Sequence, residues 1–198
     1  MIEAVKKPEQ RAAGKAARAA LCPATRRQAS AAICAQLQSL PALRAAKTVF
    51  CYHAVPPEAD PAAVCAWLKA RGVRLAYPRC AEKGRMEAWL PLDDAPFTPD
   101  VYGIPSPDPA HSRLVPPTEL DAVLVPLAAF DAAGGRVGLG AGVYDRYLPH
   151  CPQAAKIGVA FGVQQLRCAD CAAHDVRLDA VVTEDGIIYS CEVRVKGV

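Results

Sequence analysis

The chain has 198 residues, of which 52 % are hydrophobic and 22 % charged, which is ordinary usage for one globular domain with a sizeable core and excludes wholesale disorder. The formal net charge of +3 is too small to indicate a nucleic-acid partner, although it suits a pocket that receives anions. No apolar run approaches the roughly 20 residues that span a bilayer, and the N-terminal stretch lacks the apolar core of a signal peptide, so we expect a cytoplasmic protein without a membrane partner.

Helical and strand patterns alternate along the chain. Residues 9–21 are rich in Ala and Arg and contain no proline, and in residues 22–41 Ile33, Leu37 and Leu40 recur at helical spacing. Short, nearly continuous apolar runs predict buried strands. The expected elements are helices at 9–21, 22–41, 60–72 and directly after residue 142, strands at 47–55, 73–78, 86–92, 120–130 and 156–162, and a strand with a tight turn at Asp185 and Gly186 within 178–190.

This alternation predicts an α/β fold: a single layered domain over residues 1–198, with a mainly parallel central sheet flanked by helices and an N-terminal helical segment. Residues 91–118 hold many of the 18 prolines, so we expect an ordered but irregular connection there. The sequence shows no internal repeat and no clear linker between domains.

The nine cysteines favour reduced thiols over disulfides. Their number is odd, and several stand at apolar positions such as Cys34, Cys51 and Cys65, which is typical of buried thiols in a reducing compartment. Cys168 and Cys171 form the one close pair, and no second C-x-x-C accompanies it. A loop or helix start is therefore favoured over a metal site at this pair.

Five glycines within residues 134–142 follow the expected strand 120–130 and precede a helix-like stretch. Glycine is the residue that costs most to order, so a loop this rich in it indicates that something approaches the backbone closely, as a phosphate does at a helix N-terminus. The loop lies beyond the carboxyl end of a buried strand, where open α/β sheets bind ligands. It is neither a P-loop nor a G-x-G-x-x-G fingerprint, because Gly138, Gly140 and Gly142 fall at every second position. A tight strand-to-helix turn is the alternative.

Three side chains near these glycines could bind parts of a phosphorylated ligand. The Arg136 guanidinium at the loop entrance suits phosphate oxygens, and Asp145, one turn into the helix, could hold Mg²⁺ beside those phosphates. Tyr144 could stack on a flat ring. We therefore expect a site for a phosphorylated ligand here.

The segment VPLAAFDAAGGRVGLGAGVYDRYL, residues 125–148, resembles the hallmark segment of the 5-formyltetrahydrofolate cyclo-ligase family, also called 5,10-methenyltetrahydrofolate synthetases. That family's pattern is close to V-P-G-x-A-F-D-x-x-G-x-R-L-G-x-G-x-G-Y-Y-D-x-x-L. Shorter similarities run along the chain in KPEQR, YHAVPPEAD, YGIPSP and AHDVRLDAVVTE. The chain departs from the pattern at Val143, where a first Tyr is usual, and at Pro61, Ser106, Leu127, Ala128 and Ala172. We expect these departures to affect specificity and rate more than reaction class.

The resemblance implies an ATP- and Mg²⁺-dependent cyclisation of 5-formyltetrahydrofolate, with or without a polyglutamate tail, by a monomer. The formyl oxygen attacks the γ-phosphate, N10 attacks the activated carbon, and phosphate leaves. Such a reaction needs positioning and electrostatic stabilisation, which explains glycine N–H groups, cations and carboxylates without a nucleophile triad.

The resemblance also implies site residues. The phosphates of ATP would be bound by Lys7, Arg11, Arg136, Gly138, Gly140 and Gly142, with Tyr144 lining the nucleotide site. Arg136, Tyr144 and Asp145 would be the catalytic groups, and Asp145 and Asp175 would bind Mg²⁺. The folate would contact His53, Glu58, Gly138, Leu139, Gly140, Ala141 and Gly142, with Glu58 accepting hydrogen bonds from the N–H donors of the pterin.

Plainer interpretations remain for several of these residues. Lys7 and Arg11 could lie on a solvated helix face, Glu58 could be a loop acid, and Asp175 could cap a turn. Two other functions also remain open: an enzyme of the same fold that binds sugar phosphates or CoA esters without ATP, and a non-catalytic relative that binds nucleotide, folate or RNA. The presence of both Asp145 and Asp175 favours the cyclo-ligase.

Overall fold

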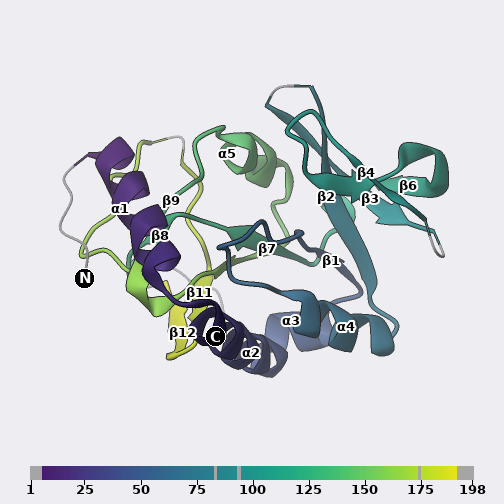
Figure 1. Ribbon diagram of the computed structural model, residues 1–198. Helices are drawn as coiled ribbons and strands as arrows, with labels where there is room; N and C mark the ends of the chain where they lie inside the picture. The colour runs from purple at the N-terminus through teal and green to yellow at the C-terminus, as the bar shows by residue number, and fades with distance from the viewer. Residues whose placement is uncertain (1–5, 83, 93–94, 174, 191–198) are drawn as a thin grey trace.

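A computed structural model of the chain describes residues 6–82, 84–92, 95–173 and 175–190. Its centre is an eight-stranded sheet in the order β12-β11-β10-β7-β1-β2-β3-β6, in which β11, β10, β7, β1 and β2 are parallel and the outer strands antiparallel (Figure 1). The predicted α/β class with a mainly parallel sheet is confirmed. The sheet strands are β1 (Thr48–Phe50), β2 (Arg74–Glu82), β3 (Arg85–Pro91), β6 (Ser112–Val115), β7 (Ala122–Pro126), β10 (Ala155–Val159), β11 (Ala180–Thr183) and β12 (Gly186–Tyr189).

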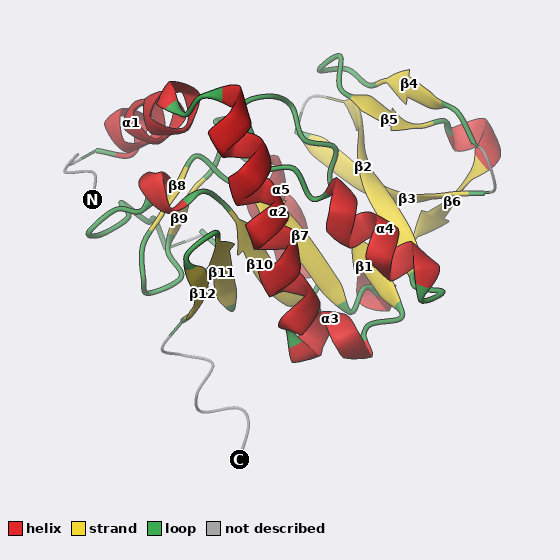
Figure 2. Ribbon diagram, turned by 60° about the horizontal axis from the view of Figure 1, so that its bottom comes forward, coloured by secondary structure: helices red, strands yellow, loops and turns green. Residues whose placement is uncertain are grey.

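Both faces of the sheet are buried, because alternate residues of its central strands enter two different cores. Val49 and Leu124 pack in the core beneath the helices α2 (Pro23–Ser39), α3 (Pro41–Ala45) and α4 (Ala62–Ala70), whereas Phe50 and Val123 pack in the core on the α5 (Val143–Tyr147) side. Figure 2 shows α2, α3 and α4 on one face of the sheet, with α5 behind it. Continuous apolar runs therefore become strands covered on both sides.

The N-terminal helix α1 (Lys7–Ala20) lies over two short strands, β8 (Ala129–Phe130) and β9 (Arg136–Val137), beyond the end of β7 (Figures 1 and 2). A Cβ atom on Gly14 would stand 2.1 Å from the carbonyl oxygen of Ala128. The α1 backbone thus approaches the segment after β7 as closely as only glycine permits. Gln10 fastens the first turns of α1, since its amide donates to the Cys168 carbonyl at 2.9 Å and accepts from the Asp170 N–H at 2.8 Å.

Some element boundaries differ from those expected. The predicted helix 22–41 divides, because Pro41 forces Leu40 into an extended conformation and starts α3. The predicted strands 47–55 and 120–130 shorten to β1 and β7, and their remaining residues form loops or join the β8–β9 hairpin. The turn near Asp185 and Gly186 is confirmed as the link between β11 and β12.

The prediction that residues 91–118 are an irregular connection was wrong in part. β6, in this stretch, pairs antiparallel with β3 at the edge of the main sheet, and β4 (Phe97–Pro99) pairs with β5 (Pro105–Pro107). Proline is tolerated at such edge positions, where its missing N–H faces no partner strand. Within the described ranges, no helix is both long enough and apolar enough to cross a membrane.

We expect Gly14→Ala to lower the free energy of unfolding by about 1–3 kcal/mol, because the added methyl group must displace the Ala128 carbonyl. Helix propensity alone would instead favour alanine by about 1 kcal/mol. Urea unfolding followed by circular dichroism measures the difference. Ala16→Gly, at an exposed position of the same helix, reports the effect of propensity without the close approach. A Gly14→Ala protein more stable than the parent would contradict the close packing of α1.

Candidate active site

A cavity of about 420 Å³ opens beyond the carboxyl end of β7. Its wall is built by α1, by the strands β2 and β3, and by the segment that follows β1. Residues 100–106, the glycine loop (residues 138–142) and α5 complete it. Such a position, at the carboxyl edge of a mainly parallel sheet, is where the sequence predicts the site. The predicted residues that line the cavity are His53, Glu58, Arg136, Gly138, Leu139, Ala141, Gly142, Tyr144 and Asp145.

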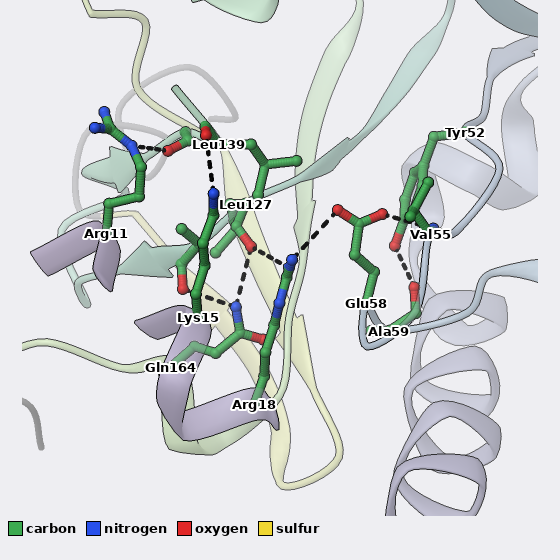
Figure 3. Close-up of polar contacts among 12 residues, drawn as sticks. Arg11, Lys15, Arg18, Tyr52, Val55, Glu58, Ala59, Leu127, Leu139 and Gln164 are labelled. Atoms are coloured by element: carbon green, nitrogen blue, oxygen red, sulfur yellow. Dashed lines mark hydrogen bonds and ion pairs between the residues drawn. The ribbon is translucent and has the colours of Figure 1, made fainter. Parts of the chain in front are cut away.

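Cationic side chains hold the glycine loop by its carbonyl groups. Arg11 Nε donates to the Gly138 carbonyl at 2.8 Å, Lys15 Nζ to Leu139 at 3.2 Å and Arg146 Nη2 to Ala141 at 2.6 Å. Arg11 and Lys15 come from α1, so the docked helix orders a loop that would otherwise be costly to order (Figure 3).

The glycines allow the loop to turn into α5. Gly140 and Gly142 have φ angles of +126° and +63°, a backbone region that residues with a Cβ rarely adopt. In the described part of the chain, the N–H groups of residues 138–142 donate no hydrogen bond. The loop can therefore receive an anion with its backbone donors, next to the N-terminus of α5.

Arg136 and Asp145 form an ion pair in the wall of the cavity. Arg136 Nη2 lies 2.5 Å from Asp145 Oδ1, and the two side chains are only 2 % and 19 % exposed. Arg136 Nε is buried without a hydrogen-bond partner among the described residues, and so is the hydroxyl of Tyr144. Burial raises the pKa of Tyr144, which keeps its hydroxyl protonated as a donor. The structure thus brings the three predicted catalytic residues together with two unused donors.

Glu58 is held at the opposite wall. Its Oε2 accepts from the Val55 N–H at 3.0 Å, and its Oε1 lies 3.6 Å from Nη2 of Arg18 on α1 (Figure 3). The hydroxyl of Tyr52 donates to the Ala59 carbonyl at 2.6 Å, which fixes the loop that carries Glu58. Burial raises the pKa of Glu58, and the Val55 N–H and the charge of Arg18 oppose this rise.

Sequence reasoning missed Lys15 and Arg18. Both line the cavity, and both belong to a stripe of cations at positions 7, 11, 15 and 18 of α1. Spacings of three and four residues place these cations on one helix face. This periodicity was the signal that could have identified them.

His53 forms an aromatic part of the wall. Its ring stacks on Tyr77 at a centroid distance of 5.1 Å and meets Phe97 edge-on at 4.7 Å. Burial lowers the pKa of His53, which favours the neutral ring in this apolar stack. The residue therefore lines the cavity as a neutral aromatic ring rather than as a charge.

Four predicted site residues lie outside the cavity wall: Lys7, Arg11, Gly140 and Asp175. Lys7 pairs with Asp175, whose carboxylate also accepts from the Ala172 N–H at 2.7 Å. Asp145 and Asp175 are thus bound to different cations, Arg136 and Lys7, and only Asp145 lines the cavity. Over the described ranges, no group of three or more His, Cys, Asp and Glu side chains could hold a metal ion.

Two departures from the family pattern lie in the cavity wall. Val143 lines it at the start of α5, and Ser106 lines it as a fully buried residue whose hydroxyl donates to the Ile104 carbonyl at 3.1 Å. Cys168 and Cys171 lie outside this wall, and none of the eight cysteines in the described ranges forms a disulfide.

Comparisons with known proteins agree with this architecture. The 5-formyltetrahydrofolate cyclo-ligase of Haemophilus influenzae is 30 % identical over 127 residues, or 62 % of this chain and 68 % of that protein. The enzyme of the same name from Mycolicibacterium smegmatis is 32 % identical over 143 residues, or 69 % of this chain and 73 % of that protein. The 5,10-methenyltetrahydrofolate synthetase of Aquifex aeolicus superposes with a TM-score of 0.80 at 28 % identity and 92 % coverage of each chain.

A second solved structure, a 5,10-methenyltetrahydrofolate synthetase from Mycoplasma pneumoniae, has a TM-score of 0.74 at 23 % identity and covers 91 % of this chain and 99 % of its own; it shows the same fold. The family model described as the 5-formyltetrahydrofolate cyclo-ligase family matches residues 3–184. The chain is therefore an enzyme that belongs to the 5-formyltetrahydrofolate cyclo-ligase family.

Proposed function

We propose that this chain cyclises 5-formyltetrahydrofolate to 5,10-methenyltetrahydrofolate with hydrolysis of ATP to ADP and phosphate. The observation that carries the proposal is the meeting of Glu58, Arg136, Tyr144, Asp145 and the glycine loop around one cavity, in a member of this family. An acceptor for pterin N–H groups and donors for phosphoryl oxygens thus border the same space.

The proposed reaction has two steps. The formyl oxygen attacks the γ-phosphorus and ADP leaves, which converts a poor leaving group into a phosphate ester. The N10 lone pair then attacks the activated carbon, N10 releases its proton to solvent, and phosphate departs with the former formyl oxygen. The protein has no covalent step to perform, so its contribution is to orient the two substrates and to stabilise charge.

The phosphoryl end of the reaction would lie at the glycine loop. The free N–H groups of residues 138–142 and the unpartnered Arg136 Nε can donate to phosphoryl oxygens, and the Tyr144 hydroxyl can donate to the oxygen that moves between carbon and phosphorus. Lys7 and Arg11 remain proposed phosphate ligands that would have to leave or share their present partners.

The residues present fit a Mg²⁺ ion bound with ATP. Mg²⁺ usually keeps several waters and takes one or two carboxylates together with substrate phosphates, so Asp145 in the cavity wall is a sufficient protein ligand. When bound, the ion would neutralise phosphate charge. The ion pair with Arg136 would hold the Asp145 carboxylate in place for this role. Asp175 remains a second proposed ligand, although its carboxylate pairs with Lys7.

The folate end would lie between Glu58 and His53. The Glu58 carboxylate can accept from the amino and ring N–H groups of the pterin, and the neutral His53 ring can contact its flat face.

We further propose that residues 1–198 act as one domain, as a monomer and in the cytoplasm, and that a polyglutamate tail is optional.

Absorbance tests the proposal directly. We expect the near-ultraviolet band of the methenyl product to grow when the protein is mixed with 5-formyltetrahydrofolate, Mg²⁺ and ATP, and to stay absent without ATP or with EDTA. A flat trace from folded protein would refute the reaction. Calorimetry with ATP and with the folate would then separate a binding protein from an enzyme with another substrate.

Asp145→Asn should lower kcat by about 10²-fold or more, because a neutral amide keeps a hydrogen bond to Arg136 but loses the charge that holds Mg²⁺ and orients the guanidinium. Steady-state kinetics at several Mg²⁺ concentrations measures the loss. Asp185→Asn, in the exposed turn before β12, is the matched control and should keep full activity. Unchanged Mg²⁺-dependent turnover in Asp145→Asn would remove Asp145 from the mechanism.

Glu58→Gln should raise the KM for the folate about tenfold and leave the KM for ATP and kcat nearly unchanged, because it replaces an acceptor used equally in the ground and transition states. The same kinetics on Glu119→Gln, a surface carboxylate paired with Arg113, should match the parent. A rise in the KM for ATP would show that Glu58 faces the nucleotide instead.

A further inference from the structure

Arg18 joins two walls of the cavity. It lies near the C-terminal end of α1, and its side chain is 8 % exposed. Nη1 donates to the Leu127 carbonyl at 3.3 Å, and Nη2 lies 3.6 Å from Glu58 Oε1 (Figure 3). The guanidinium therefore connects the end of β7 with the loop that carries Glu58.

The Leu127 carbonyl group, to which Arg18 donates, is itself held in place. Gln164 donates from Nε2 to the Leu127 carbonyl at 3.0 Å and to the Ala128 carbonyl at 2.8 Å, and it is almost completely buried. Gly14 brings α1 against this same segment. Arg18 thus projects toward Glu58 from a rigid base, which limits where the Glu58 carboxylate can lie.

The charges around Glu58 make Arg18 its main compensating cation. Glu58 is 7 % exposed, so the ionised carboxylate is costly to bury without a partner. From α1, Lys15 also faces it, but Lys15 is exposed and bound to the Leu139 carbonyl. The hydroxyls of Tyr52 and Tyr144 also face Glu58, and burial raises the pKa of both phenols, which keeps them neutral.

Other titratable groups border the loop of Glu58 without an ion pair to it. Arg26 and Arg27 of α2 and Asp60 line a second groove that Glu58 also borders, and His53 lines the cavity as an aromatic wall. Burial raises the pKa of Glu58, and the Val55 N–H, Arg18 and Lys15 lower it. Loss of Arg18 therefore shifts Glu58 toward its protonated form.

The ionisation of Glu58 matters for the proposed substrate. A carboxylate accepts hydrogen bonds at both oxygens, whereas a protonated acid has turned one oxygen into a donor. The amino group and the neighbouring ring N–H of a pterin present two donors side by side. Only the ionised carboxylate matches this edge at both positions.

We infer that Arg18 is a positioning residue for pterin recognition: it holds the Glu58 carboxylate ionised and aimed into the cavity, so that Glu58 accepts from both N–H donors of the folate. The inference rests on the proposed folate site. It assigns to α1 a role in substrate selection, beyond its contacts with the glycine loop.

The test compares Arg18→Met, which removes the charge at similar length, with Arg18→Lys, which retains it. In ligand-free protein, ¹³C NMR follows the titration of Glu58; calorimetry measures binding of 5-formyltetrahydrofolate without ATP between about pH 5.5 and 9. We expect Arg18→Met to raise the pKa of Glu58, to weaken folate binding about tenfold at neutral pH and to move the acidic loss of affinity to higher pH. Arg18→Lys, which retains the charge, should show each of these changes to a smaller extent.

The direction of the shift in the pH dependence of binding follows from the protonation state of Glu58. A higher pKa leaves more of Glu58 protonated at any given pH, so the variant loses affinity at a pH where the parent still binds. Arg44→Met removes the same charge from an exposed position of α3, before β1, and should match the parent. Thermal unfolding checks that the variants are folded. If Arg18→Met does not fold, Arg18→Gln, which keeps a donor for the Leu127 carbonyl, repeats the comparison.

A double-variant cycle separates positioning from a general structural effect. In a Glu58→Gln background, which has no titrating group at this position, Arg18→Met should weaken folate binding by less than about twofold. An unchanged Glu58 titration, or a full tenfold loss in that background, would overturn the role of Arg18 while the parent still binds folate. A parent protein that binds no folate at any pH would instead overturn the folate site itself, and the inference with it.

Discussion

The close contact between α1 and the segment after β7 is the constraint on which the site depends. Gly14 lets the helix backbone approach the Ala128 carbonyl, and from that position the cations of α1 reach the carbonyl groups of Leu127, Gly138 and Leu139. The end of β7 and the glycine loop are thereby ordered by the same helix. Burying these polar backbone groups without such partners would cost free energy comparable to the lost hydrogen bonds.

The sheet supplies the second requirement, a rigid edge. β7 lies between β1 and β10 with every residue buried, and the Asp121 carboxylate accepts from the N–H groups of Lys47 and Thr48 at 2.7 and 2.8 Å, which fixes the start of β1 against β7. Because β1 and β7 are parallel, both strands end at the same carboxyl edge of the sheet. One continues to Glu58 and the other to the glycine loop, so two segments far apart in sequence meet across one cavity.

Local patterns in the sequence predicted the central strands, because these are short and nearly continuous apolar runs. They predicted the first two helices from an Ala- and Arg-rich composition without proline and from apolar residues at helical spacing. They also predicted the glycine loop and its neighbours Arg136, Tyr144 and Asp145, which lie within ten residues of one another. They did not predict β6, since a proline-rich stretch becomes an edge strand only when β3 presents a partner. Nor did they predict the contacts of Lys7 with Asp175 or of Arg18 with Glu58, because long-range pairing depends on how α1 docks rather than on any local periodicity.

Two buried ion pairs border the cavity, Arg18 with Glu58 on one side and Arg136 with Asp145 on the other. Such pairs add little to stability, because the cost of removing two charges from water offsets much of their attraction. Each pair here joins different segments, and among the described residues each leaves a buried Nε donor without a partner, on Arg18 and on Arg136. The Glu58 carboxylate also has acceptor capacity beyond its contacts with Val55 and Arg18. A carboxylate acceptor at one wall and the donors of Arg136 and Tyr144 at the other suit a ligand with N–H groups at one end and anionic oxygens at the other. The placement of the charges is thus better explained by the two ends of a reaction than by the stability of the fold.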